Sequence, residues 1–106
     1  MYARNIALHL KPNTLSDFAK TFDSNVLPIL RKQKGFKDEI TFATTGGTDV
    51  VAISLWETKE NAEAYNVSGY PEVLKSLDKF LDGTPKVRVS DVISSTMHRT
   101  AVGVSA

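Results

Sequence analysis

Hydrophobic residues recur along this chain with two periods, and the changes from one period to the other predict the order of its elements. A two-residue period, which is the pattern of a strand, covers residues 2–10, 36–45, 49–57 and 86–99. A three- and four-residue period, which is the pattern of an amphipathic helix, covers residues 15–30, 59–67 and 71–81. The predicted order is therefore β-α-β-β-α-β, with the second helix split in two.

Proline and glycine residues are expected to interrupt these helices. Pro28 has no backbone N–H and crowds the carbonyl of Ser24, so we expect a kink near residues 26–28. Gly35 stands where a helix ends in the left-handed conformation that glycine tolerates best. The pair Ser68-Gly69 is expected to break the second helix.

The strand at residues 49–57 is apolar on both faces, whereas a sheet with one wet face alternates cleanly between apolar and polar residues. One face carries Val51, Ile53 and Leu55, and the other carries Val50, Ala52, Ser54 and Trp56. We therefore expect both faces of the sheet to be covered.

The strand at residues 36–45 has a different pattern. One face carries Phe36, Ile40 and Phe42, and the other carries Lys37, Glu39 and Thr41. The polar face predicts a position near the edge of the sheet or partly in contact with water.

Arg4 interrupts the apolar pattern of the first strand and is either solvated or neutralises a substrate anion.

This order of elements is that of the ferredoxin-like split βαβ fold, which belongs to the α+β class. Right-handed crossovers place both helices on one face of a four-stranded antiparallel sheet. The other face would be bare and partly apolar, which is a poor surface for a monomer. We therefore expect a homodimer packed sheet against sheet. The chain of 106 residues is expected to be one domain, residues 1–106, with a core at 2–99 and a loose tail at 100–106.

Composition narrows the chemistry available to the chain. It has no cysteine, which excludes disulfides, thiolate zinc sites and iron–sulfur clusters. The formal net charge is +1 and the basic residues are scattered, so we expect no nucleic-acid partner. No apolar run is long enough to span a bilayer, and Asn5 and His9 interrupt any signal-type segment at the N-terminus. We expect a soluble, cytoplasmic protein with no membrane partner.

Short motifs carry a resemblance to a known family. They are Leu27-Pro28, Gly35-Phe36 and the stretch ISLWETKENAEAY at Ile53–Tyr65, where a strand ends in Trp-Glu and a helix follows at once. With these motifs the chain resembles, over residues 2–99, the antibiotic biosynthesis monooxygenase-like proteins of the dimeric α+β barrel superfamily. The resemblance leaves the reaction open, because the superfamily includes quinone-forming monooxygenases, haem-degrading enzymes, decarboxylating or muconolactone-type enzymes and members without a known reaction.

The haem-degrading branch of this superfamily uses an Asn on the first strand, and a Trp and a His on the second helix. In this chain Asn5 matches the Asn, Tyr65 stands at the Trp position and Lys75 stands at the His position. The ammonium group of Lys75 is no substitute for the imidazole that would ligate the iron. We therefore favour other activities over haem degradation.

The candidate catalytic residues are Asn5, His9 and Tyr65. A buried Asn needs partners for its amide, so Asn5 binds either a substrate oxygen or O2-derived anion, or else backbone and water. His9 falls on the same side of the first strand as Asn5. It is either a general base or a surface or interface residue.

The candidate substrate-binding residues are Trp56, Tyr70 and Lys75. Tyr65 and Tyr70 flank the break at Ser68-Gly69, which is a natural mouth for a pocket between the sheet and the helices, and we expect that pocket to lie near Asn5. Packing is the simpler role for Trp56 and for both tyrosines.

No motif for a bound cofactor is present. The sequence has no Gly-rich phosphate loop, no Rossmann pattern and no set of His, Asp and Glu spaced for a metal, so we expect neither a cofactor nor a metal. The first hypothesis is a cofactor-independent monooxygenase that acts on a small aromatic or quinol-like substrate and stabilises its anion in an apolar pocket. The second is a non-catalytic dimer that binds a small molecule in the same pocket.

Overall fold

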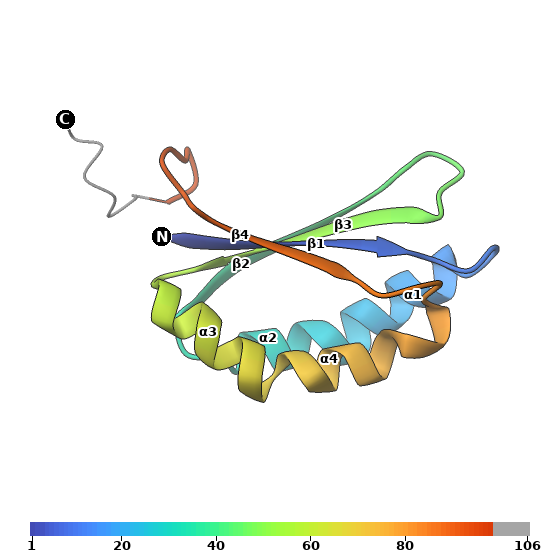
Figure 1. The fold of residues 1–106 in the computed structure, drawn as a ribbon, viewed down its shortest axis with the longest axis horizontal. Helices are drawn as coiled ribbons and strands as arrows, with labels where there is room; N and C mark the ends of the chain where they lie inside the picture. The colour runs from blue at the N-terminus through green and yellow to red at the C-terminus, as the bar shows by residue number, and fades with distance from the viewer. Residues whose placement is uncertain (99–106) are drawn as a thin grey trace.

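The computed structural model describes residues 1–98, which form one antiparallel sheet with helices packed against a single face of it (Figure 1). The strands are β1 (Tyr2–His9), β2 (Phe36–Ala43), β3 (Asp49–Trp56) and β4 (Lys86–Asp91), in the spatial order β2-β3-β1-β4. The predicted ferredoxin-like α+β fold with a four-stranded sheet is confirmed. The tail predicted at residues 100–106 lies outside the described residues.

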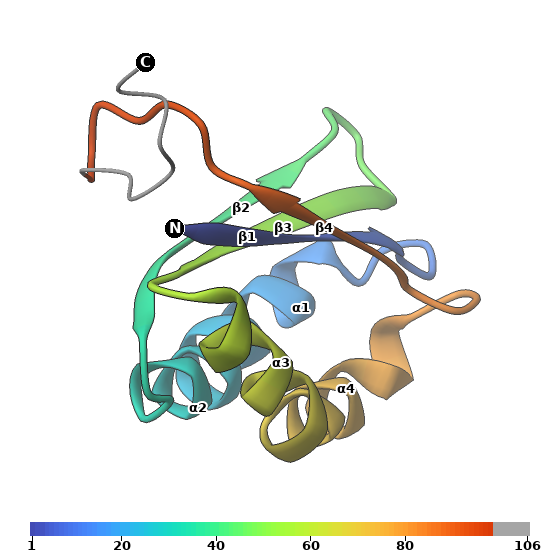
Figure 2. The same ribbon diagram turned by 60° about the vertical axis from the view of Figure 1, so that its left-hand side comes forward.

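The helices form one layer beneath the sheet (Figure 2). The first helical segment consists of α1 (Leu15–Thr21), a π-helical turn (Phe22–Val26) and α2 (Leu27–Arg31). The second consists of α3 (Lys59–Ser68), α4 (Tyr70–Leu77) and a 3₁₀ turn (Asp78–Phe80). In the part of the chain that the structure describes, no helix is long and apolar enough to cross a membrane.

The π-helical turn is the interruption predicted near Pro28. Pro28 is the second residue of α2 and has no N–H to donate to the carbonyl of Ser24. The turn before it is widened, and the N–H of Leu27 donates to the carbonyl of Phe22, five residues back. The turn matters for the site, because Phe22 and Val26 at its two ends line the cavity described below.

Alternation along β3 decides which residues face the helices. The buried set is Val50, Ala52, Ser54 and Trp56, and Trp56 has no exposed surface at all. The residues between them lie on the far face and are half-buried. Ile6 and Leu8 of β1 lie on the same helix-side face, and the helices pack Phe18, Val26, Leu30, Val73 and Leu77 against it.

The predicted edge position of β2 is confirmed, as is the grouping of Ile40 with Phe42 opposite Glu39 and Thr41, but the placement of Phe36 on the side of Ile40 and Phe42 is wrong. A β-bulge between Phe36 and Asp38 shifts the pairing of β2 with β3 by one residue. Side chains alternate with a period of two, so a shift of one residue exchanges the two faces of the strand. Glu39 therefore faces the helices, whereas Ile40 and Phe42 are each 52% exposed on the far face.

The last strand is shorter than the predicted 86–99, of which residue 99 lies outside the described chain. β4 ends at Asp91, whose partner on β1 is Tyr2, the first residue of that strand. Beyond this pair, Met1 is the last residue of the chain that can pair with β4, and its carbonyl accepts a hydrogen bond from the N–H of Val92. Residues 92–98 therefore alternate in sequence but have no partner strand in the described part of the chain.

The far face of the sheet carries no helix within residues 1–98 (Figure 1). It presents half-exposed apolar side chains from β2 and β3, together with Asn5 and His9 from β1. Packing of a second copy against this face stays a prediction.

Candidate functional site

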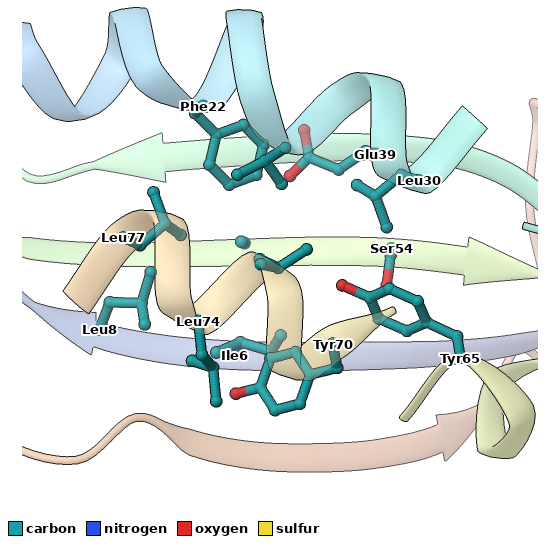
Figure 3. A pocket seen from close by; sticks show the side chains of 13 residues that line it. Ile6, Leu8, Phe22, Leu30, Glu39, Ser54, Tyr65, Tyr70, Leu74 and Leu77 are labelled. Atoms are coloured by element: carbon teal, nitrogen blue, oxygen red, sulfur yellow. The ribbon is translucent and has the colours of Figure 1, made fainter. Parts of the chain in front are cut away.

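A small apolar cavity lies between the helix-side face of the sheet and the helices (Figure 3). Its volume is about 30 Å³, as swept by the centre of a water-sized sphere, and a single water needs roughly 10–15 Å³ on this scale. The location between sheet and helices agrees with the prediction. The lining residues are Ile6, Leu8, Phe22, Val26, Leu30, Glu39, Ala52, Ser54, Tyr65, Tyr70, Val73, Leu74 and Leu77.

Four polar side chains enter this apolar shell, and they come from different elements. Glu39 comes from β2, Ser54 from β3, Tyr65 from α3, and Tyr70 from the first residue of α4 (Figure 3). Every other lining side chain is aliphatic or phenylalanine. The site therefore offers one carboxylate and three hydroxyl groups to a molecule that is otherwise apolar.

Glu39 is the only carboxylate among the lining residues. Burial raises the pKa of Glu39; a hydrogen bond donated by the Thr41 hydroxyl opposes the rise, and the like charge of Asp23 adds to it. Glu39 also lines an open groove of about 390 Å³ between α1 and β2. Because Glu39 lines both the cavity and the groove, its carboxylate is placed to take a proton from a bound molecule and release it to solvent.

A stack of aromatic rings holds Tyr65 at the cavity wall. The ring of Tyr65 stacks on Trp56 with centroids 4.8 Å apart, and the edge of Phe36 meets Trp56 at 5.5 Å. Trp56 Nε1 donates to Ser54 Oγ over 2.8 Å, so the Ser54 hydroxyl can still donate its own proton to a ligand. Gly69 closes the packing, because a Cβ there would lie 2.8 Å from Cδ1 of Tyr65.

Arg4 lies against the two cavity tyrosines. Its guanidinium is 4.6 Å from the ring centroid of Tyr70 and 5.2 Å from that of Tyr65. Burial raises the pKa of Tyr65 and of Tyr70, and the positive charge of Arg4 opposes this rise without cancelling it. Both hydroxyls therefore keep their protons at neutral pH and act as hydrogen-bond donors.

Asn5 and His9 do not line the cavity. Side chains alternate along β1, and Arg4, Ile6 and Leu8 take the buried positions on the helix side. The expected location of Asn5 beside the cavity is therefore wrong, because the sheet lies between them. His9 is exposed, and its Nδ1 lies 2.8 Å from a carboxylate oxygen of Asp49.

The remaining predicted residues are divided. Tyr65 and Tyr70 both line the cavity. Trp56 is buried behind Tyr65 and is not a lining residue, and Lys75 is exposed on α4. Of the predicted site residues, only the two tyrosines that flank Gly69 are brought together at the cavity.

Glu39 and Ser54 were missed from the sequence. They are cross-strand partners, but the bulge that turns Glu39 inward leaves no signature in the sequence. Arg4 was visible in the sequence as a charged residue inside an apolar strand pattern, and such a residue, when buried, needs partners for its charge. Within residues 1–98, no three His, Asp or Glu side chains come together in a way that could hold a metal ion.

Solved structures match the chain over most of its length. A monooxygenase from the gene ActVA-Orf6 of Streptomyces coelicolor, in complex with Nanaomycin D, matches with a TM-score of 0.72 and 21% identity over 84% of each chain. A variant of SnoaB, a cofactor-independent oxygenase from Streptomyces nogalater, matches with a TM-score of 0.73 and 12% identity over 92% of this chain and 97% of that chain. The chain has the fold of the antibiotic biosynthesis monooxygenases.

This fold also occurs in proteins without an assigned reaction. NE2512 from Nitrosomonas europaea, a protein of unknown function, matches with a TM-score of 0.77 and 13% identity over 92% of this chain and 94% of that chain. No protein-family model matches the sequence. A search of curated proteins likewise finds no match. The comparisons therefore establish the monooxygenase-like fold alone, since one fold hosts many reactions.

Proposed function

We propose that the protein is a cofactor-independent monooxygenase that oxidises a small, electron-rich aromatic molecule of the phenol or quinol type in the cavity between sheet and helices. The observation that carries the proposal is Glu39, a carboxylate of raised pKa on the wall of an otherwise apolar cavity. A phenol has to lose a proton before it readily passes an electron to O2. Two proteins of this fold described as a monooxygenase and a cofactor-independent oxygenase support the same chemistry.

Glu39 takes the proton of the substrate hydroxyl. The raised pKa makes its carboxylate a stronger base, and the outer groove gives the proton a route to solvent. Tyr65 and Ser54 donate hydrogen bonds to the phenolate oxygen that forms. The apolar side chains around them keep bulk water away from the anion and from the radical species that follow.

The oxidation balances with O2 as the only other reactant. The phenolate transfers one electron to O2, which gives a substrate radical and superoxide. These combine at a ring carbon that bears hydrogen, and a proton returned by Glu39 completes the hydroperoxide. The O–O bond then breaks as Glu39 takes the hydrogen of that carbon as a proton and passes it to the departing hydroxide. One oxygen atom stays in the quinone product, and the other leaves as water.

The cavity has to open to admit an aromatic ring, since its volume is only about 30 Å³. Phe22 lines both this cavity and the open groove between α1 and β2, so it forms part of the wall between them. It is also the first residue of the π-helical turn, where the helix departs from its regular hydrogen bonding. We expect the substrate to enter from the groove by displacement of Phe22.

The proposal is tested by O2 uptake with a panel of anthrones, naphthols and quinols, measured against protein-free controls. The Glu39→Gln variant is expected to lose about 100-fold or more in kcat/KM, the usual contribution of a general base. Tyr65→Phe is expected to lose roughly tenfold, because one hydrogen bond to the anion is removed. Glu72→Gln is the matched control, since Glu72 is exposed on α4.

Equal kcat/KM values for the Glu39→Gln and Glu72→Gln variants would show that Glu39 is not the base. Binding of these aromatic molecules without O2 uptake across the whole panel would refute the enzymatic proposal. It would support the second hypothesis, a non-catalytic small-molecule-binding protein of the same fold.

A further inference from the structure

Arg4 is a cation buried on the helix-side face of β1, with only 3% of its surface exposed. It makes no salt bridge with any residue in the described chain. Its Nη1 donates to Oδ1 of Asn66 over 3.0 Å, but its Nε and Nη2 are buried without a hydrogen-bond partner. Buried donors of a charged group are costly when unpaired, so their lack of an acceptor calls for an explanation.

The neighbouring aromatic rings do not supply the missing acceptor. Tyr65 and Tyr70 stabilise the charge of Arg4 through cation–π contacts with their ring faces. The five N–H groups of a guanidinium lie in its plane and require an acceptor oxygen there. Asn66 provides one such oxygen, and two of the three guanidinium nitrogens remain without any.

Arg4 and Asn66 also line an open groove of about 420 Å³ between α3 and the edge strand β4. Neither Tyr65 nor Tyr70, the two tyrosines that contact Arg4, lines this groove. Asn66 lies over the guanidinium and accepts a hydrogen bond from it. The side chain of Asn66 is exposed, so it has room to move away from Arg4. The apolar lining residues are Tyr2, Ala62, Val67, Val87 and Val89, and Glu63 is the remaining one.

We propose that this groove binds a small carboxylate with an apolar body, a site separate from the cavity of the proposed oxidation. The carboxylate accepts hydrogen bonds from Nε and Nη2 of Arg4, the two nitrogens without a partner, in the paired geometry that a guanidinium offers, and Asn66 moves aside to admit it. The exposed side chains of Val67 and Val89 contact the apolar body of the ligand. The negative charge of Glu63 on the groove disfavours a more highly charged anion such as phosphate.

The test is an NMR titration of the amide signals with 2-naphthoate and, as its uncharged counterpart, 2-naphthamide. We expect shifts at Val67, Val87 and Val89, and naphthoate binding about tenfold tighter than naphthamide, the effect of charge-assisted hydrogen bonds. Arg4→Gln should abolish this preference. Arg88→Gln is the matched control, because Arg88 lies on the far face of β4 and should leave both affinities unchanged.

Two further variants keep the proposal testable if Arg4→Gln does not fold. Glu63→Gln is expected to bind naphthoate about two- to threefold more tightly, because a nearby like charge is removed. Val89→Trp fills the groove, so it should abolish naphthoate binding and leave O2 uptake unchanged. Equal affinity for naphthoate and naphthamide, shifts confined to Val26 and Val73 of the cavity, or unchanged binding by Val89→Trp would each overturn the proposal.

Discussion

Replacement of Trp56 by phenylalanine measures how firmly the aromatic stack holds the cavity wall. Trp56 is fully buried, stacks on Tyr65 at 4.8 Å and donates to Ser54 Oγ over 2.8 Å. The lost hydrogen bond is worth about 1 kcal/mol. Full truncation of a buried Trp costs about 3–5 kcal/mol, and the retained phenyl ring keeps part of the packing, so we expect a total loss of about 2 kcal/mol.

The assay is urea and thermal unfolding at one fixed protein concentration. A loss of about 2 kcal/mol corresponds to a fall in Tm of roughly 8–16 °C for a domain of this size. Ser54→Ala is expected to cost about 1–3 kcal/mol, because it leaves the buried indole N–H unpaired. In the double variant neither partner remains, so its cost should be about 1 kcal/mol smaller than the sum of the single costs.

The reasoning is refuted if the two substitutions are additive to within about 0.3 kcal/mol, since additivity is the behaviour of independent sites. It is also refuted if Trp56→Phe changes Tm by no more than about 2 °C, which is the effect expected of a surface substitution. Additivity would mean that the hydrogen bond from Trp56 to Ser54 does not contribute to stability, and an unchanged Tm would mean that Tyr65 is held at the cavity wall by other contacts.

Three further predictions concern other parts of the molecule. Burial raises the pKa of Glu39 above its ordinary value of 4.5, so its protonated form stabilises the fold at low pH and this contribution is lost as the pH rises through the raised pKa. The free energy of unfolding of Glu39→Gln in urea should therefore rise relative to that of the wild type as the pH increases from 4 to 7; a difference between the two proteins that does not change with pH contradicts this. Haemin with a reductant in air should lose no more Soret absorbance with the protein than without it, because the resemblance puts Lys75 at the position where the haem-degrading branch has its iron-ligating His. Protein-dependent loss with release of a cleaved tetrapyrrole contradicts this. Light scattering at micromolar concentration should give twice the mass of one chain, and Phe42→Asp on the far face should reduce it to that of a monomer; a wild-type monomer contradicts the predicted homodimer.

The order of elements was predictable because it depends on periodicity, which survives small local changes. The helix interruption beside Pro28 was also predictable, because proline has no N–H to donate and so disturbs the hydrogen bonding of any helix that contains it. The alternation of residues 39–42 on β2 was predictable, but the side on which Phe36 lies relative to them was not, because one bulged residue near Lys37 exchanges the faces. The end of β4 was not predictable either, because it depends on where β1 begins.

The candidate site was only partly predictable, because a cavity is assembled by residues that are distant in the sequence. Tyr65 and Tyr70 were found because the helix break at Gly69 is visible as a local motif. Glu39 depends on the bulge for its inward position, and its sequence neighbours suggested a wet face. Asn5 was expected beside the cavity because a buried amide needs partners, but the alternation of β1 places it on the opposite face.

The central claim is that an aromatic substrate binds between the sheet and the helices with its hydroxyl against Glu39. It is tested most directly by a crystal structure of the protein with a naphthol-type substrate, grown and frozen without O2. We predict a ring seated among the lining residues of the cavity, with Phe22 displaced and the substrate oxygen within hydrogen-bond distance of the Glu39 carboxylate. A ring bound on the far face beside Asn5, with the cavity still closed, would contradict the claim.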